Sequence, residues 1–144
     1  MGEVLGIALR DKPRAPMQTL TEAEITELAG LTGDFRGAVR GRQVTVLTEE
    51  GWRAACAELG EDLPWTTRRA NLLVRDIDLK GRIGTRLRVG EAVLVITDEC
   101  DPCGVMEKAR KGLRKTLITD WRAGATCRVA LGGIVRVGDK AELA

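Results

Sequence analysis

The sequence predicts a mostly β protein with helices, folded as a compact closed β-barrel (α+β by content). Many short segments alternate apolar and polar residues, and glycine interrupts them at 17 of 144 positions. The few helical segments do not alternate with strands in a regular βαβ order, which favours a barrel with added helices. The chain is long enough to bury a core and shows no linker, so we expect a single domain over residues 1–144.

Short apolar alternations rich in β-branched residues predict the strands. They occupy residues 4–9 (VLGIAL), 43–48 (QVTVLT), 70–79 (ANLLVRDIDL) and 126–131 (TCRVAL). Two further stretches, 86–96 (RLRVGEAVLVI) and 134–143 (IVRVGDKAEL), each place Arg-Val-Gly-acid between apolar alternations. Because glycine readily adopts positive φ, each of these stretches predicts a strand, a tight turn and a second strand.

Three segments carry helical signals. Residues 21–35 are rich in Ala, Glu and Leu, and Thr21 begins a capping-box pattern. Residues 49–60 place apolar side chains at helical spacing and end at a glycine suited to a C-cap. Residues 104–121 separate apolar from basic positions, and Gly112 weakens the middle of this segment, so we expect two short helices there.

Composition excludes several classes of function. The net charge is only +2, and the sequence has three tryptophans, one phenylalanine and no tyrosine. Neither a strong positive field nor an aromatic stacking platform for nucleic acid is therefore expected. The N-terminus lacks the pattern of a signal peptide, and no apolar run approaches the length of a membrane span. We expect a cytoplasmic protein with no nucleic acid or membrane partner, whose four cysteines are thiols.

The stretch ECDPCG at residues 99–104 is the most informative local motif. Its two cysteines, Cys100 and Cys103, have the spacing of half a zinc site, but a structural zinc ion normally has four ligands. The sequence has no histidine, and the remaining cysteines, Cys56 and Cys127, are isolated from each other. A redox dithiol is a second interpretation, although a thioredoxin-like fold requires a βαβ context that these residues lack.

A single functional thiol is a third interpretation of the same stretch. Cys103 follows Pro102 and precedes a predicted helix, whose N-terminal amides would favour a thiolate. Without histidine there is no Cys-His pair for protease-type catalysis, but a thiolate can also bind a soft metal or carry sulfur. Cysteines also serve as small buried hydrophobic residues, and this is the interpretation we favour for Cys100 and Cys127.

The order of the motifs along the chain resembles the MOSC domain, which is named for the C-terminal part of molybdenum-cofactor sulfurase. The resemblance runs from about residue 4 to residue 143 and implies a compact, mostly β barrel, in agreement with the strand pattern. The motifs that carry it are GDFRGAVRGRQVTVLTEEGW (33–52), RRANLLVRDIDL (68–79), GTRLRVGEAVLVIT (84–97), CDPCGVMEKARKGL (100–113) and GATCRVALGGIVRVGDKAEL (124–143).

The resemblance implies a ligand and a set of site residues. The ligand is the molybdenum cofactor (molybdopterin), a pterin dithiolene that bears a phosphate. The signature cysteine of the family falls on Cys103, which is implied as the catalytic thiol and the metal ligand. An Arg-x-Asn element falls on Arg69 and Asn71, and an Arg-Gln element on Arg42 and Gln43. Arginine suits a phosphate, and asparagine offers a donor and an acceptor to a ring edge. Without the resemblance, we would interpret Arg42 as a solvated charge at a strand end and Asn71 as the cap of a turn.

The family also implies the function. Its members bind the molybdenum cofactor or carry sulfur through one thiolate, and some reduce N-hydroxylated small molecules with electrons from a partner protein. Two alternatives stay open: a cofactor-free thiol protein in sulfur chemistry, where Cys100 and Cys103 form a redox or carbon–sulfur bond-cleaving pair, and a module that delivers the cofactor. Cys100 would otherwise act as a resolving thiol for Cys103. We expect this short chain to lack the additional N-terminal barrel of larger members, which supplies part of their pterin pocket.

Overall fold

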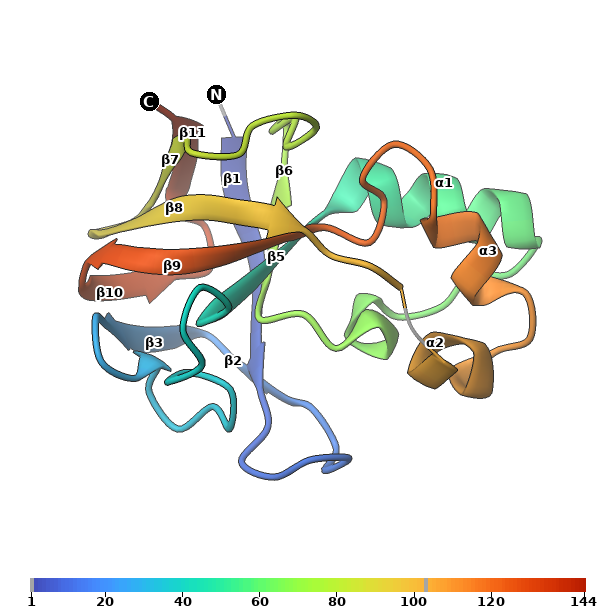
Figure 1. Cartoon of the computed structure of the whole chain (residues 1–144), viewed down its shortest axis with the longest axis horizontal. Helices are drawn as coiled ribbons and strands as arrows, with labels where there is room; N and C mark the ends of the chain where they lie inside the picture. Colours follow the sequence, from blue (N-terminus) through green and yellow to red (C-terminus); the bar gives the residue numbers. More distant parts are fainter. Residues whose placement is uncertain (1, 103) are drawn as a thin grey trace.

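Seven strands form a closed barrel. The computed structural model describes residues 2–102 and 104–144. The barrel strands are β1 (Gly2–Leu9), β5 (Val44–Thr48), β6 (Leu72–Arg75), β7 (Arg86–Val89), β8 (Ala92–Glu99), β9 (Ala125–Leu131) and β11 (Lys140–Leu143). They pair in the order β11-β7-β8-β9-β5-β6-β1, and β1 pairs again with β11 to close the ring (Figure 1). The predicted mostly β, closed-barrel fold is confirmed.

A small second sheet packs against the barrel core. It consists of β10 (Gly133–Arg136), β3 (Glu22–Thr26) and β4 (Gly30–Leu31), while β2 (Gln18–Leu20) extends the main sheet beside β1. Ile25, Leu31 and Val135 from the small sheet are fully buried and belong to the same apolar cluster as the barrel strands. The main core is therefore shared between the two sheets.

The helix predicted over residues 21–35 is wrong, because this segment forms β3, a turn and β4. In β3 the side chains of Ala23 and Ile25 face inward and those of Glu22 and Glu24 face outward, which is the two-residue period of a strand. Antiparallel pairing with β10 satisfies the backbone of this segment. Pairing with a strand more than a hundred residues away therefore overrides the local helical propensity.

The helices lie together on one side of the barrel (Figure 1). They are α1 (Glu49–Leu59), α2 (Gly104–Ala109), α3 (Leu113–Leu117) and the short 3₁₀ helix η1 (Trp65–Arg68). The helix expected over 49–60 is confirmed, with the Thr48 side chain as its N-cap and Gly60 as its left-handed C-cap. The expected division of residues 104–121 into two short helices is confirmed as well. Trp52, Leu113 and Leu117 belong to a second apolar core formed with the helices.

The connection from β5 through α1 and η1 to β6 makes β5 and β6 the one parallel neighbour pair among the described strand pairs. The sequence pattern had shown no regular βαβ alternation, and this single crossover is compatible with that.

The strand predicted over residues 70–79 is shorter in the structure, because the chain turns away after Arg75. Asp76 adopts a left-handed conformation with φ of 59° at this point, which ends the extended backbone.

The two Arg-Val-Gly-acid stretches differ in the structure. The first forms a hairpin, in which Val89 pairs with Ala92 across a two-residue turn. The second also makes a tight turn, where an oxygen of Asp139 accepts a hydrogen bond from the backbone N–H of Arg136 at 2.7 Å. Its two strands do not pair with each other, because β10 joins β3 and β11 joins β7 and β1. This stretch therefore connects the two sheets.

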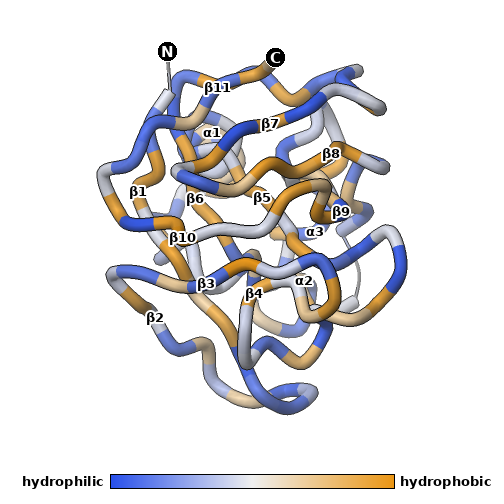
Figure 2. The backbone as a smooth tube through the Cα atoms, turned by 90° about the vertical axis from the view of Figure 1, so that its left-hand side faces the viewer, coloured by the Kyte–Doolittle hydropathy of each residue, from blue (hydrophilic) through white to orange (hydrophobic). Residues whose placement is uncertain are grey.

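Hydrophobic residues recur along the barrel strands, and hydrophilic residues concentrate in the turns between them (Figure 2). Residues of β1, β6, β8 and β9 supply much of the fully buried apolar core. Across residues 2–102 and 104–144, no helix combines the length and the apolar character needed to cross a membrane.

Candidate functional site

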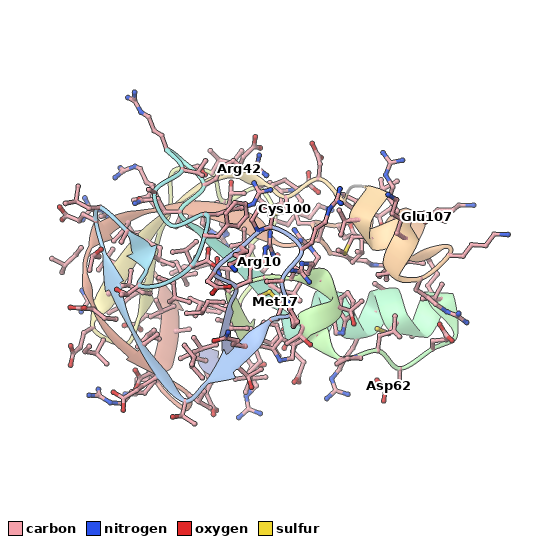
Figure 3. All side chains as sticks on the ribbon, turned by 90° about the horizontal axis from the view of Figure 1, so that it is seen from below. Arg10, Met17, Arg42, Asp62, Cys100 and Glu107 are labelled. Carbon is pink, nitrogen blue, oxygen red and sulfur yellow. The ribbon has the colours of Figure 1, made fainter. Side chains whose placement is uncertain are left out.

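A pocket of about 540 Å³ lies where the barrel meets the helices. Its volume falls within the range of roughly 300–1,000 Å³ typical of small-molecule sites. Figure 3 labels Arg10, Arg42 and Cys100, three of the lining residues, in one central region of the molecule. The basic lining residues are Arg10, Arg14, Arg36, Arg42, Arg68 and Arg69. The remaining lining residues are Pro13, Asp34, Phe35, Thr45, Asn71, Cys100, Asp101, Val105 and Met106.

The structure brings together three of the residues that the resemblance implies. Arg42, Arg69 and Asn71 all line this pocket, although they come from different segments of the chain. Cys103, which the resemblance also implies, lies outside the described residues. Asp101 precedes it by two positions and Val105 follows it by two, and both line the pocket.

The end of η1 positions Arg69. Its φ is 66°, so the chain turns left-handed there, and its backbone N–H donates to the carbonyl of Thr66 at 3.0 Å. The side chain extends across the pocket, where Nη2 donates to the carbonyl oxygen of Ala15 in the loop after β1. Arg69 therefore connects two walls of the pocket.

Asn71 lines the pocket, but its side chain is engaged in the fold. Oδ1 accepts from the backbone N–H of Thr45 at 3.0 Å and lies 3.2 Å from the Thr45 hydroxyl oxygen, which donates to it. Nδ2 donates to the carbonyl oxygen of Ala8 at 3.2 Å. The side chain thus ties β5 to β1 at the floor of the pocket. One amide hydrogen remains for a ligand, since the Asn amide carries two.

Gln43 has a similar structural role in the other motif. It is buried, its Nε2 donates to the carbonyls of Glu27 and Gly37, and its Oε1 accepts from the backbone N–H of Val129 at 2.8 Å. The neighbouring Arg42 is exposed and lines the pocket. In this motif, as in Arg69-Ala70-Asn71, a buried amide fixes the backbone and the arginine faces the pocket.

Four of the lining arginines were not identified from the sequence: Arg10, Arg14, Arg36 and Arg68. Arg68 directly precedes Arg69 in a resemblance motif, which was the one available signal for it. Its Nε donates to the carbonyl of Ala123 at 2.8 Å. The others come from loops that converge only in the folded chain. With six arginines and two aspartates in the lining, the pocket has an excess of positive charge that favours an anionic ligand.

Cys100 is buried at the wall of this pocket, 4% exposed. Burial raises the pKa of its thiol, and the nearby guanidinium groups of Arg68 and Arg42 oppose that rise only in part. Cys100 is therefore a protonated thiol at neutral pH, and its reactivity is low.

Cys56 and Cys127 are buried as well, and burial raises the pKa of Cys127 strongly. For Cys100 and Cys127 this agrees with the interpretation as small buried hydrophobic residues. Among the described residues, no group of three or more cysteine or carboxylate side chains is placed to share a metal ion.

A comparison with models of protein families identifies the family of this chain. The family model of the MOSC domain matches residues 32–142, about three quarters of the chain. The chain belongs to the MOSC domain family. A comparison with functionally curated proteins gave no significant match.

Solved structures share the MOSC fold of this chain. The YuaD protein from Bacillus subtilis superposes with a TM-score of 0.81 at 19% identity, covering 99% of this chain and 96% of that one. YiiM from Geobacillus stearothermophilus gives a TM-score of 0.79 at 13% identity, covering 100% and 75%. YiiM from Escherichia coli gives 0.75 at 19% identity, covering 99% and 69%. At these identities the likeness concerns the fold alone.

The MOSC family is associated with the molybdenum cofactor, and the residues of the pocket fit such a group. A phosphate-bearing ligand requires cationic donors, and six arginines supply them. Arg10 Nε is a buried donor without a hydrogen-bond partner within the described part of the chain, as expected where a ligand would complete the set. Phe35, Val105 and Met106 add apolar surface for a ring system.

Proposed function

We propose that this protein binds the molybdenum cofactor in the arginine-lined pocket, with Cys103 as the working thiolate. The observation that carries the proposal is the convergence on one pocket of six arginines and of residues on both sides of Cys103. A cofactor with a phosphate and a dithiolene is an anion, and a partly enclosed site of positive charge favours it.

Each part of the lining has a role in this proposal. Arg42, Arg68 and Arg69 would be among the arginines that bind the anionic groups of the cofactor through charge-assisted hydrogen bonds. Asn71, directly before β6, hydrogen-bonds to β5 on one side and β1 on the other beneath the cofactor, and offers its remaining amide hydrogen to the ring edge. When bound, the cofactor would supply a molybdenum centre for reduction of an N-hydroxylated small molecule. Cys103 would provide the thiolate, which is the metal-binding form of cysteine.

The state of Cys100 favours a single working thiol over a dithiol pair. Thiol–disulfide exchange requires an accessible thiolate, whereas Cys100 is buried and its pKa is raised. Such a residue is poorly suited to attack or to resolve a neighbouring sulfur. This supports cofactor binding, or sulfur carriage on Cys103 alone, over the redox or bond-cleaving pair.

The proposal also covers the source of electrons, the entry of the substrate and the cellular location of the reaction. Electrons for a reductive reaction would come from a partner protein, as the resemblance to the family implies. A small-molecule substrate would enter at the pocket mouth, where Phe35 and Val105 are exposed. We place this activity in the cytoplasm, where the thiols stay reduced.

Cofactor content tests the proposal directly. The protein is produced in a host competent for cofactor synthesis, and molybdenum is measured by mass spectrometry together with the fluorescence of the oxidised pterin. We expect both in the wild type. Arg69→Ala should bind the cofactor more weakly by roughly 1.5–3 kcal/mol, the contribution of a hydrogen bond to a charged group.

The matched control is Arg40→Ala, since Arg40 is exposed and does not line the pocket. It should load like the wild type. Molybdenum and pterin no higher than in protein from a cofactor-deficient host would overturn the proposal. Sulfane sulfur on Cys103 without pterin would instead favour the interpretation that the protein carries sulfur.

A further inference from the structure

Arg10 directly follows β1, and the described residues offer its guanidinium group only a weak hydrogen-bond acceptor. Its Nε is buried and unpaired within residues 2–102 and 104–144. Its Nη1 donates to the thioether sulfur of Met17 at 3.7 Å, and sulfur of this kind is a weak acceptor. Its guanidinium carbon lies 5.4 Å from the centroid of the Phe35 ring, a contact that leaves the positive charge unneutralised.

The charges around Arg10 repel it more than they neutralise it. Burial and the like charges of Arg69, Arg36 and Arg68 lower its pKa, and Asp34 opposes this only in part. The oxygens of Asp34 are already used by the backbone: Oδ1 accepts from the N–H of Arg10 and Oδ2 from the N–H of Arg36, both at 3.2 Å. An anionic ligand is the partner that this arrangement would accommodate.

Loop 10–17 connects β1 to β2 and forms one wall of the same pocket. Pro13 and Arg14 line the pocket from this loop. The loop is attached to η1 through the hydrogen bond from Arg69 Nη2 to the carbonyl of Ala15, and to Arg10 through Met17. Both acceptors are neutral. An anion held by arginines on the loop and on η1 would add charge-assisted contacts between the two walls.

We propose that Arg10 is a principal anion-binding side chain of the pocket, and that a bound phosphate monoester fastens loop 10–17 against η1. Three donor groups on two segments (Arg10 and Arg14 in the loop, Arg69 at the end of η1) suit a tetrahedral dianion better than a single planar carboxylate. The inference rests on the proposed function for the identity of the natural ligand. Inorganic phosphate carries the same chemistry and allows a test without molybdenum.

Phosphate binding is measured by titration calorimetry on the full chain, at constant ionic strength set with chloride. Arg10→Gln should weaken the affinity about tenfold or more, as expected for loss of a hydrogen bond to a charged group. Arg40→Gln and Met17→Leu should bind like the wild type, because the first lies outside the pocket and the second keeps every charge. In chloride alone, Arg10→Gln should unfold at the same temperature as the wild type or higher, because it removes a cation from a repulsive environment.

Limited trypsin digestion reports on the loop. If only the phosphate-free form is cut, phosphate at ten times its Kd should slow cleavage after Arg14 about tenfold in the wild type. The slowing should be lost in Arg10→Gln and kept in Arg40→Gln.

Three results would overturn the inference: equal phosphate affinity of Arg10→Gln and Arg40→Gln, unchanged cleavage with phosphate, or equal protection in both variants. If Arg10→Gln does not fold, Arg10→Met, which also removes the charge, replaces it, and unchanged affinity of that variant would be equally decisive. Phosphate binding that depends on Arg10, in a protein that never loads cofactor, would leave this inference standing and overturn the proposed function. If Arg10→Gln loads the cofactor as fully as the wild type, the proposed function would stand and this inference would be overturned.

Discussion

Replacing Asn71 with alanine separates a structural role of this residue from a role in ligand binding. The side chain makes three hydrogen bonds, two with Thr45 and one with the carbonyl of Ala8, and Asn71 is only 5% exposed. Its loss leaves the backbone N–H of Thr45 and the carbonyl of Ala8 without these partners. Each unsatisfied buried group costs about 1–3 kcal/mol. Because Thr45 is half-buried and water can reach it, we expect a total loss near the lower end, about 3 kcal/mol.

Urea unfolding followed by circular dichroism measures this loss, with an unchanged m-value as the sign that the unfolded state is unaffected. The corresponding fall in Tm is roughly 6–12 °C for a chain of this length. Thr45→Val removes only the hydroxyl partner and should cost about 1 kcal/mol. At a temperature where Asn71→Ala is folded, its phosphate affinity should match that of the wild type. A loss of stability below about 1 kcal/mol, together with failure to load cofactor, would refute the reasoning and make ligand binding, rather than support of the fold, the main role of Asn71.

Three further predictions concern the thiols and the backbone. Cys103→Ser should abolish cofactor loading with little loss of stability, whereas Cys100→Ser should keep most of the loading. Loss of loading in Cys100→Ser alone would favour the dithiol alternative. In the native protein, iodoacetamide should leave Cys100 and Cys127 largely unmodified at neutral pH, because burial raises both pKa values, and peptide mass spectrometry would reveal early labelling that contradicts this. Gly124→Ala should cost about 3 kcal/mol, since φ is 93° and the new Cβ would lie 2.2 Å from the carbonyl oxygen of Val46. Gly60→Ala, with φ of 82° but nothing within 4 Å, should cost only about 1 kcal/mol in the same urea unfolding assay, and equal losses would contradict the steric argument.

Local patterns alone were sufficient for much of the barrel. The alternation in residues 43–48 and 126–131, and the Arg-Val-Gly-acid turn within 86–96, specify strands and a hairpin because side-chain direction and glycine conformation are properties of neighbouring residues. The helix over 49–60 was predictable for the same reason, since its periodicity and both caps lie within the segment. Arg42, Arg69 and Asn71 came from the order of motifs along the chain, and the structure places all three at one pocket.

Tertiary structure decided what depends on partners distant in sequence. Residues 22–26 have helical composition but form a strand, because the edge of β10 and the space beside Ile25 become available only in the folded chain. The cationic pocket has the same origin. Arg10, Arg36 and Arg68 stand on a strand end, a loop and a 3₁₀ helix, and nothing in their local sequence relates one to another. Their mutual repulsion, and the unpaired Nε of Arg10 among them, arise only when barrel closure brings these segments together.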